Sequence, residues 1–254
     1  MRRLLITTSI ALTLAGAATC LAFPSSNCRP NAIDRIVPEF QIHNPASSIA
    51  AFLIDLGRQT GVCIGIEIAD DKLLAPLDAA ALPEPGGILR SILVQSIPAG
   101  AGYTIEIDDG VILIRQLRAV NPPLDVTISS FDLDGRGTLA EAGTALHIRV
   151  RRNLDSSIQG IAGTIHNTNP NNRVTSIHEK DRTARFLLDR IVQQSTTGAA
   201  WIAGGCDAED FKRGQNSCWA MLAYDSPPER FADLARGAVS EVLVHIQQRN
   251  EPKL

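Results

Sequence analysis

The chain is poor in aromatic residues, and this shortage restricts how it can build a hydrophobic core. Phe, Trp and Tyr together make up 4% of the 254 residues, whereas hydrophobic residues as a whole make up 44%. A hydrophobic fraction of 44% is ordinary for a globular protein. The core is therefore expected to consist mainly of Ile, Leu, Val and Ala. A chain of this length forms either one large domain or two small ones.

An excess of positive charge is also missing. The formal net charge is −3, and no long block of like charge occurs anywhere in the sequence. A nucleic-acid-binding surface needs a concentrated basic face, and a polyanion partner favours a run of basic residues. We therefore expect no nucleic-acid partner.

Short motifs that carry known chemistry are absent. The sequence contains no GxSxG, no HExxH and no CxxC, and no glycine-rich phosphate-binding loop follows a strand pattern. The five histidines are scattered, although His147, His166 and His178 fall in one half of the chain and offer a metal site as the weaker alternative. We expect no catalytic residue, no cofactor and no metal.

The first residues have the pattern of an export signal. Arg2 and Arg3 precede an apolar stretch over 4–18 that is short and rich in Ala and Thr, unlike a membrane span. Small residues follow, and a cleavage site ending at Ala22 is plausible. We interpret 1–22 as a signal peptide, which predicts a periplasmic protein without a transmembrane span in the mature chain.

A lipoprotein signal is the alternative reading of the same stretch. Cys20 closes a run of small residues and is then the lipidated residue. Thr19 argues against this alternative, because lipoprotein signals usually carry Gly, Ala or Ser at that position. Lipidation would associate the protein with the outer membrane.

Export changes how the remaining cysteines are interpreted. Four thiols in an oxidising compartment can pair in three ways. Cys206 and Cys218 bracket an irregular polar stretch between two apolar runs, so we predict a disulfide between them. Cys28 and Cys63 would then pin the N-terminal arm to a core strand. A buried free thiol at Cys63 stays open as the alternative.

The first half of the chain alternates strand and helix patterns. Ile49, Phe52, Leu53 and Leu56 have the i, i+3, i+4, i+7 spacing of one helix face, and Gly61 is a helix stop. Asp-Gly between two apolar runs is a strong hairpin signal. The expected elements are a strand over 35–42, the helix, a strand over 62–68, a helix through 88–93, and hairpin strands over 103–107 and 111–114.

A weaker version of this pattern returns in the second half. Phe131 matches Phe40 at an offset of 91 residues, and the helix near Ile191 matches the earlier helix at an offset of 99. The excess is assigned to an Asn-rich loop. The expected elements are a linker over 121–123, a strand over 126–133, a helix through 139–146, alternation over 148–151, a loop over 153–173, a helix over 184–191 and a strand around Trp201.

The predicted fold class is α+β, with two tandem small β-α-β-β-α-β-like modules that each pack two helices on small sheets. The first module is assigned to 35–118 and the second to 124–225. An amphipathic helix over 226–250 follows, with apolar residues at helical spacing. This helix either packs back on the second module or binds a partner.

Residues 40–62 read Phe-Gln-Ile-His, then the apolar helix stripe, then Gln-Thr-Gly-Val, and 88–114 add a second helix and a closing hairpin. This pattern resembles the short N-terminal (STN) domain of secretins and TonB-dependent transducers over about 36–116. The likeness is looser over 124–203. His43 stands where that family usually has Pro, and the sequence shows no secretin channel or receptor barrel.

The resemblance implies a periplasmic interaction module near the cell outer membrane. In that family such modules signal through anti-sigma regulators or take part in assembly of an outer-membrane channel. We therefore predict a non-enzymatic protein that binds another envelope protein, either an anti-sigma regulator or a secretion component.

Sheet edges are the candidate binding surfaces, because an edge strand can accept a strand from another chain. The first strand is the predicted interaction edge, with Arg35, Ile36, Val37, Glu39 and Gln41.

The rival interpretation is a periplasmic metal-dependent enzyme, or a small-ligand sensor, with its site between the two modules. The enzyme would use His166 and His178 together with the acidic residues of 207–210. The sensor would use the loop over 153–173 as a lid.

Overall fold

The computed structural model describes residues 28, 32–42, 47–78, 86–116, 122–135, 137–156, 172–204, 208, 212 and 219–250. The predicted signal peptide lies outside these residues, as do Cys20, Cys206 and Cys218. The elements are η1 (Ala32–Asp34), α1 (Ile49–Thr60), β1 (Cys63–Ile68), η2 (Lys72–Leu74), α2 (Leu89–Ser96), β2 (Tyr103–Asp108), β3 (Val111–Gln116), α3 (Pro122–Asp125), β4 (Thr127–Leu133), α4 (Leu139–Leu154), β5 (Ile177–Thr183), α5 (Ala184–Gln193), β6 (Ala199–Gly204), β7 (Trp219–Ala223) and α7 (Pro228–Asn250).

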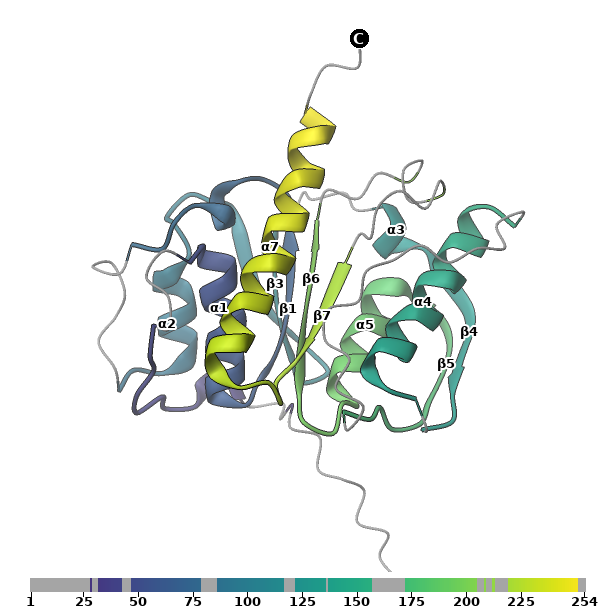
Figure 1. Ribbon diagram of the computed structural model, residues 1–254, viewed down its shortest axis with the longest axis horizontal. Coiled ribbons are helices and arrows are strands. Elements are labelled where there is room, and N and C mark those ends of the chain that lie inside the picture. Colours follow the sequence, from purple (N-terminus) through teal and green to yellow (C-terminus); the bar gives the residue numbers. More distant parts are fainter. Residues whose placement is uncertain are drawn as a thin grey trace, which may run out of the picture.

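Five strands form one mixed sheet in the order β2-β3-β1-β6-β7. The central strand β1 runs parallel to both β3 and β6, while β2 and β7 are antiparallel to their neighbours at the two ends. Strands β4 and β5 form a separate antiparallel pair. Helices α1, α2 and α7 cover one face of the sheet, and α4, α5 and the β4–β5 pair lie on the other (Figure 1).

Alternation along the strands divides the apolar residues between two cores, one on each face of the sheet. Ile64, Ile66 and Ile68 of β1 belong to the core beneath α1, α2 and α7. Cys63 of β1 and Trp201 of β6 belong to the core beneath α4 and α5. Successive side chains of a strand point to opposite faces. A strand that is buried on both faces, as β1 is, therefore marks the centre of the fold.

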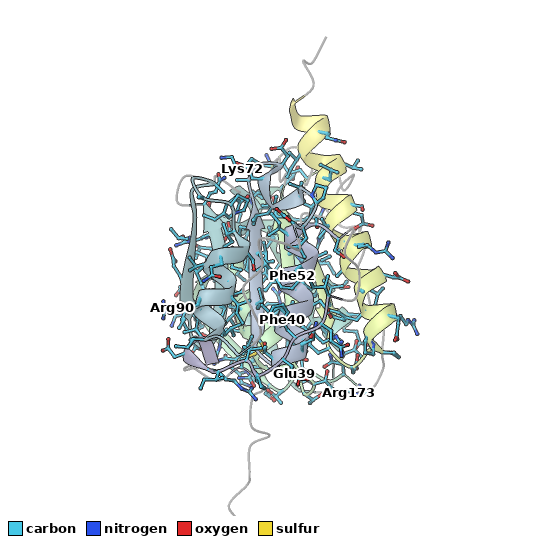
Figure 2. All side chains as sticks on the ribbon, turned by 90° about the vertical axis from the view of Figure 1, so that its left-hand side faces the viewer. Glu39, Phe40, Phe52, Lys72, Arg90 and Arg173 are labelled. Carbon is cyan, nitrogen blue, oxygen red and sulfur yellow. A yellow bond between two sulfur atoms is a disulfide. The ribbon has the colours of Figure 1, made fainter. Side chains whose placement is uncertain are left out.

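Helix α1 follows the sequence pattern closely. Ser48 caps its first turn by accepting a hydrogen bond from the N–H of Ala51, and Gly61 ends it with a φ of 68°. A left-handed glycine is a common helix stop. The ring of Phe52 meets Phe40 edge-on at 5.9 Å between centroids, on the face seen in Figure 2. The predicted helix is confirmed.

The β2–β3 hairpin is also confirmed. Its two-residue loop consists of Asp109 and Gly110, with φ angles of 45° and 88°. Positive φ at both central residues is the signature of a type I′ turn, whose twist matches that of the strands it joins. Arg190 of α5 holds this turn, because its Nη1 lies 2.6 Å from a carboxylate oxygen of Asp109.

The predicted α+β class is confirmed, whereas two tandem modules with separate small sheets are not. Strands β6 and β7 from 124–225 extend the sheet that β1, β2 and β3 from 35–118 begin. The order of elements does repeat, since α1-β1-α2-β2-β3 is matched by α4-β5-α5-β6-β7. The strand pairing does not repeat, because β6 joins β1 rather than β5.

The polarity of β5 explains this difference. Strand β1 reads Cys-Ile-Gly-Ile-Glu-Ile and is buried along its whole length, whereas β5 reads Ile-His-Glu-Lys-Asp-Arg-Thr and is mostly exposed. Placing β5 at the centre of a second sheet would bury several charged groups at a large cost. Strand β6 pairs with β1 instead, and its Trp201 ring covers Gly65, where an added Cβ would lie 2.5 Å from the ring.

Three shorter predictions are corrected. Residues 35–42 do not form a strand, since Ile36 makes only an isolated bridge with Ile88. Residues 148–151 lie inside α4, which Thr138 starts with a capping box to Glu141. Most of the predicted linker over 121–123 belongs to α3. In α4 the buried positions recur at helical spacing, so the brief alternation of apolar and basic residues there was misleading.

Helix α7 docks on the protein, as one of the two alternatives predicted. Phe231, Ala235, Ala238 and Val242 are buried in the core that α7 shares with α1. The helix therefore packs on α1 as well as on β6 and β7. The sequence had predicted packing on the second module, 124–225, alone. Among the described residues no helix is long and apolar enough to span a membrane.

A disulfide joins Cys28 to Cys63, with 5.1 Å between the Cα atoms. This separation is ordinary for a disulfide. Both residues are buried in the core beneath α4 and α5. The bridge attaches the N-terminal arm to the first residue of the central strand, which is the role that the sequence left open for this pair.

Candidate functional site

Among the described residues, strand β2 is one end of the five-stranded sheet and pairs only with β3. In an antiparallel pair, residues alternate between those that bond to the neighbouring strand and those whose N–H and C=O groups point away. In a two-residue type I′ hairpin, the residues that flank the loop, here Asp108 and Val111, exchange backbone hydrogen bonds with each other. By alternation, the backbone N–H and C=O groups of Thr104, Glu106 and Asp108 point toward β3. The backbone groups of Tyr103, Ile105 and Ile107 therefore point outward, along what we call the β2 edge.

A pocket of about 330 Å³ with both apolar and polar groups in its lining lies between β2 and α2. Arg90 and Val94 line it from α2, Ile97 lines it just after the helix ends, and Tyr103 and Ile105 line it from β2. Val94 is 56% exposed although it is apolar. Figure 2 places Arg90 at the margin of the molecule away from α7. We call this hollow the α2-side pocket.

A second pocket of about 520 Å³ lies on the opposite face of β2, toward β5 and α5. We call it the α5-side pocket. Its lining is highly charged and comes from both halves of the chain: Glu106, Ile107, Asp108, Leu113, Arg115, Asp181, Arg182, Thr183, Arg185 and Phe186.

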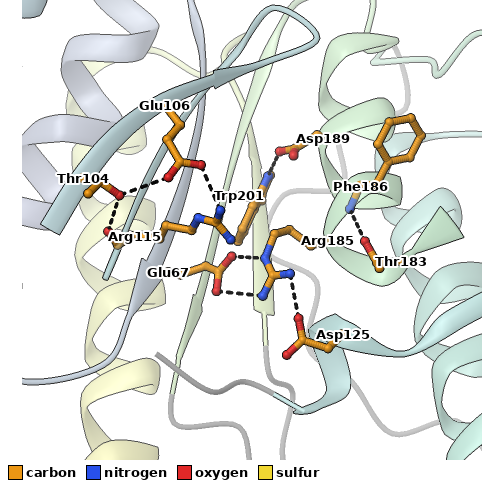
Figure 3. Close-up of polar contacts among 10 residues, drawn as sticks. All are labelled: Glu67, Thr104, Glu106, Arg115, Asp125, Thr183, Arg185, Phe186, Asp189 and Trp201. Atoms are coloured by element: carbon orange, nitrogen blue, oxygen red, sulfur yellow. Dashed lines mark hydrogen bonds and ion pairs between the residues drawn. The ribbon is translucent and has the colours of Figure 1, made fainter. Parts of the chain in front are cut away.

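Arg185 at the base of the α5-side pocket links three elements (Figure 3). Its guanidinium donates hydrogen bonds to both carboxylate oxygens of Glu67 on β1. Its Nη1 also donates to a carboxylate oxygen of Asp125 on α3 at 2.7 Å. Glu67 is 1% exposed. Burial opposes the charge of Arg185, but the bonds and charges of Glu67 and Asp125 raise the pKa of its guanidinium. The cation therefore serves to hold the fold together.

Arg115 on β3 is occupied in the same way. Its Nη2 lies 2.9 Å from Glu106 on β2, and the Thr104 hydroxyl donates to both Glu106 and the Arg115 carbonyl (Figure 3). Arg182 contacts Glu179 and stacks its guanidinium 4.7 Å from the centre of the Phe186 ring. All three arginines of the pocket thus have acidic partners.

Two further carboxylates line the α5-side pocket, those of Asp108 and Asp181. Within the described residues, Asp108 at the end of β2 and Asp181 on β5 make no side-chain hydrogen bond or ion pair. Asp181 has a φ of 52°, a left-handed conformation that Asn and Asp adopt more readily than most residues. The pocket therefore presents unpaired negative charge from both of its walls.

A buried acid lies behind this pocket. Asp189 of α5 is 2% exposed, and the indole N–H of Trp201 donates to it at 2.7 Å (Figure 3). Burial raises the pKa of Asp189 well above its ordinary value, and the Trp201 hydrogen bond offsets only part of this rise. The side chain fixes Trp201 over Gly65 and does not line the pocket.

The start of β2 is fixed by a polar cluster. The Tyr103 hydroxyl donates to Asp70 at 3.2 Å, and the amide nitrogen of Gln116 donates to the other oxygen of Asp70 at 2.6 Å. Lys72 lies 3.3 Å from the same carboxylate. Burial raises the pKa of the Tyr103 hydroxyl. Both ends of the hairpin are therefore anchored, which gives the β2 edge a defined position.

Two of the three histidines predicted as alternative metal ligands lie within the described residues, and they differ in burial. His147 is buried on α4 beside Trp219, and His178 is exposed on β5 within 3.2 Å of Asp132. His166 lies outside the described residues, as do the acidic residues of 207–210 and the central part of the predicted lid. Within the described residues no three His, Cys, Asp or Glu side chains group as metal ligands.

The predicted interaction edge over 35–41 is not a sheet edge. The N–H of Val37 donates to Gly87, and the Arg35 carbonyl accepts from Leu89. Glu39 is exposed, and the backbone of Gln41 is bonded to the Gln59 side chain. Because this backbone is largely engaged inside the molecule, the segment has little left to offer to a partner strand.

The sequence reasoning predicted β2 as a strand but missed its edge position. The signal was present, because Tyr-Thr-Ile-Glu-Ile-Asp alternates apolar and polar residues. Such alternation is typical of a strand with one face toward solvent, whereas β1 reads apolar on both faces. The pockets depend on α2 and α5, whose packing no local pattern specifies.

Comparisons of the chain with protein-family models, with curated proteins and with solved structures found no match.

Proposed function

We propose that this protein is a non-enzymatic interaction module that binds an extended segment of another protein as an added strand on β2. The observation that supports it most is the free edge of the sheet, with the outward backbone groups of Tyr103, Ile105 and Ile107. Main-chain hydrogen bonds to an edge strand supply affinity, and pockets for alternate side chains supply specificity.

The two pockets support this mode of binding over simple exposure of an edge. They lie on opposite faces of β2, one lined by Ile105 and the other by Glu106. Alternate side chains of an added strand point to opposite faces, so successive residues would enter the two pockets in turn. A long unprotected edge is otherwise a liability that proteins tend to blunt.

The cellular setting is part of the proposal. The signal-peptide pattern at 1–22 and the resemblance of 36–116 to the STN family favour a periplasmic protein, near the outer membrane, whose partner is another envelope protein. An anti-sigma regulator and a secretion component are the two partner classes that the resemblance suggests. The Cys28–Cys63 disulfide is compatible with an oxidising compartment.

The test is amide hydrogen exchange of the full mature chain, followed by NMR, with and without a capped peptide of alternating valine and threonine. We expect the amides of Tyr103, Ile105 and Ile107 to exchange on the order of tenfold more slowly when the peptide is bound. Thr104 and Glu106 provide an internal control in the same strand, because their N–H groups already bond to β3.

Two modified peptides sharpen the result. One carries N-methyl groups on every valine and the other on every threonine, so each removes the donors along one side of the peptide strand. We expect one to lose binding and the other to keep it, because only one side faces β2. Equal binding of both peptides, or protection that spares the three outward amides, would contradict strand addition.

A further inference from the structure

We propose that the partner segment alternates apolar and basic residues, with the apolar side chains in the α2-side pocket and the basic ones in the α5-side pocket. This inference rests on the proposed function, since it names the chemistry of the strand that β2 accepts. The proposed occupant is an extended basic segment of another protein.

The α2-side pocket selects an apolar side chain. Val94, Ile97 and Ile105 line it, and Arg90 stands at its rim with Asp34 as an ion-pair partner at 3.4 Å. A Val, Ile or Leu side chain placed between Val94 and Ile105 would remove both from water. Burial of a side chain of this size contributes favourably in proportion to the apolar area covered.

The α5-side pocket selects a cation, although arginines line it. Arg185 and Arg115 are held by Glu67 and Glu106, and Arg182 is held by Glu179. An anionic side chain entering the pocket would have to compete with these acids. A lysine or arginine side chain would instead meet the free carboxylates of Asp108 and Asp181 without displacing any existing pair.

The same charges argue against a second copy of this chain as the occupant. Antiparallel pairing of two β2 strands would place the α5-side faces of both copies together, because paired residues share a face. Glu106 and Asp108 of one copy would then lie near those of the other. Like charges across a strand pair are destabilising, so the edge favours a basic partner over itself.

The experiment compares three capped peptides that share valine at every second position and carry lysine, threonine or glutamate between the valines. Affinity is measured by calorimetry at low and at physiological salt. We expect the lysine peptide to bind about tenfold more tightly than the glutamate peptide at low salt, with the threonine peptide between them. The difference should shrink as salt screens the charges.

A double variant, Asp108→Asn with Asp181→Asn, isolates the pocket charge. Asn tolerates the left-handed backbone of residue 181, so the fold is expected to persist. The preference for lysine over glutamate should fall toward unity while affinity for the threonine peptide is unchanged. Asp134→Asn, which removes an exposed carboxylate outside both pockets, is the matched control and should keep the full preference.

The outcomes separate the two proposals. If none of the three peptides protects the outward amides of β2, the proposed function fails and this inference fails with it. If all three bind equally well with β2 protected, strand addition stands and the basic preference is wrong. A glutamate peptide that binds most tightly would likewise overturn the inference, since the arginines would then decide the specificity.

Discussion

Two buried carboxylates on the same face of the sheet show how differently one charge can be accommodated. Glu67 is gripped by Arg185, whereas Asp189 has an indole N–H as its hydrogen-bond partner. A neutral donor stabilises a carboxylate less than a guanidinium does, and burial therefore raises the pKa of Asp189. Glu67 and Arg185 form an ion pair, so removing one partner should lower the free energy of unfolding.

Replacing Arg185 by Met should destabilise the protein strongly. The variant leaves Glu67 buried without its cation, and removal of one partner from a buried ion pair typically costs about 3–5 kcal/mol. Urea unfolding of the full chain, followed by tryptophan fluorescence, measures this loss. The double variant Glu67→Gln with Arg185→Met should recover much of the stability, because no buried charge then remains at residue 67.

An exposed pair supplies the control for this measurement. Arg236 and Asp233 lie three residues apart on the outer face of α7, and Arg236→Met should change the unfolding free energy by less than about 1 kcal/mol. Equal losses for Arg185→Met and Arg236→Met would show that the Glu67 pair does not hold β1 to α5.

His147 should make the protein sensitive to acid. Burial, together with the charge of Arg151, lowers the pKa of His147 to about 4. The unfolded chain takes up this proton near pH 6.5, so between pH 6.5 and 4 the unfolded state binds more protons than the folded state. The free energy of unfolding should therefore fall as the pH drops through that window, by roughly 3 kcal/mol in all.

The measurement is urea unfolding of the wild type and of His147→Phe across this pH window. Phe keeps a ring against Trp219, which lies 5.4 Å away between ring centroids, but carries no titrating group. The free energy of unfolding of this variant should fall less steeply between pH 6.5 and 4 than that of the wild type. An unchanged slope in His147→Phe would refute the assignment.

At the scale of elements, local signals predicted those pieces whose structure is determined locally. The stripe Ile49, Phe52, Leu53 and Leu56 with its glycine stop predicted α1, and Asp-Gly between apolar runs predicted the β2–β3 hairpin. In each case the periodicity, the cap and the turn residue agree. Elements with such agreement are identifiable without knowledge of what they pack against.

Elements whose state depends on distant contacts were predicted less well. Ile148 and Val150 alternate with arginines, yet this stretch continues α4, because Leu146 and Val150 lie one turn apart in the core. Residues 35–42 are extended in pattern, but the backbone groups of Arg35 and Val37 bond to those of residues 86–89. Short alternating stretches are ambiguous by periodicity alone, and the longer helix decided the first of these cases.

The candidate site shows the same limit. The alternation in β2 was enough to suggest an edge strand, but the two pockets depend on where α2 and α5 settle. Asp181 and Arg185 come from the second half of the chain, and Asp108 and Arg115 come from the first. Because no local signal relates these halves, the sequence predicted a strand edge at 35–42, where the structure has only an isolated bridge between Ile36 and Ile88.

At the scale of the whole molecule, each of the two cores contains residues from both halves of the chain. Strand β6 pairs with β1 along the register from Ile64–Ala200 to Ile68–Gly204. Helix α7 packs against α1, and Arg190 of α5 holds the β2–β3 turn through Asp109. Without β6 and α7, the central strand and the apolar face of α1 would be open to water. The two halves therefore depend on each other for burial.

We expect the full chain to unfold in one cooperative step. Native-state hydrogen exchange under mild denaturant should give the most protected amides of β1 and β3 the same opening free energy as those of α5 and β6. Two serial modules would instead show two sets of free energies, with β1–β3 separated from α4–β5. An independent check compares two probes of urea unfolding. Tryptophan fluorescence reports on β6 and β7 through Trp201 and Trp219, whereas far-UV circular dichroism reports on the whole chain. A single cooperative unit should give coincident transitions by both probes. Transitions that separate by probe would contradict a single cooperative unit, and would revive the two-module organisation that the shared sheet argues against.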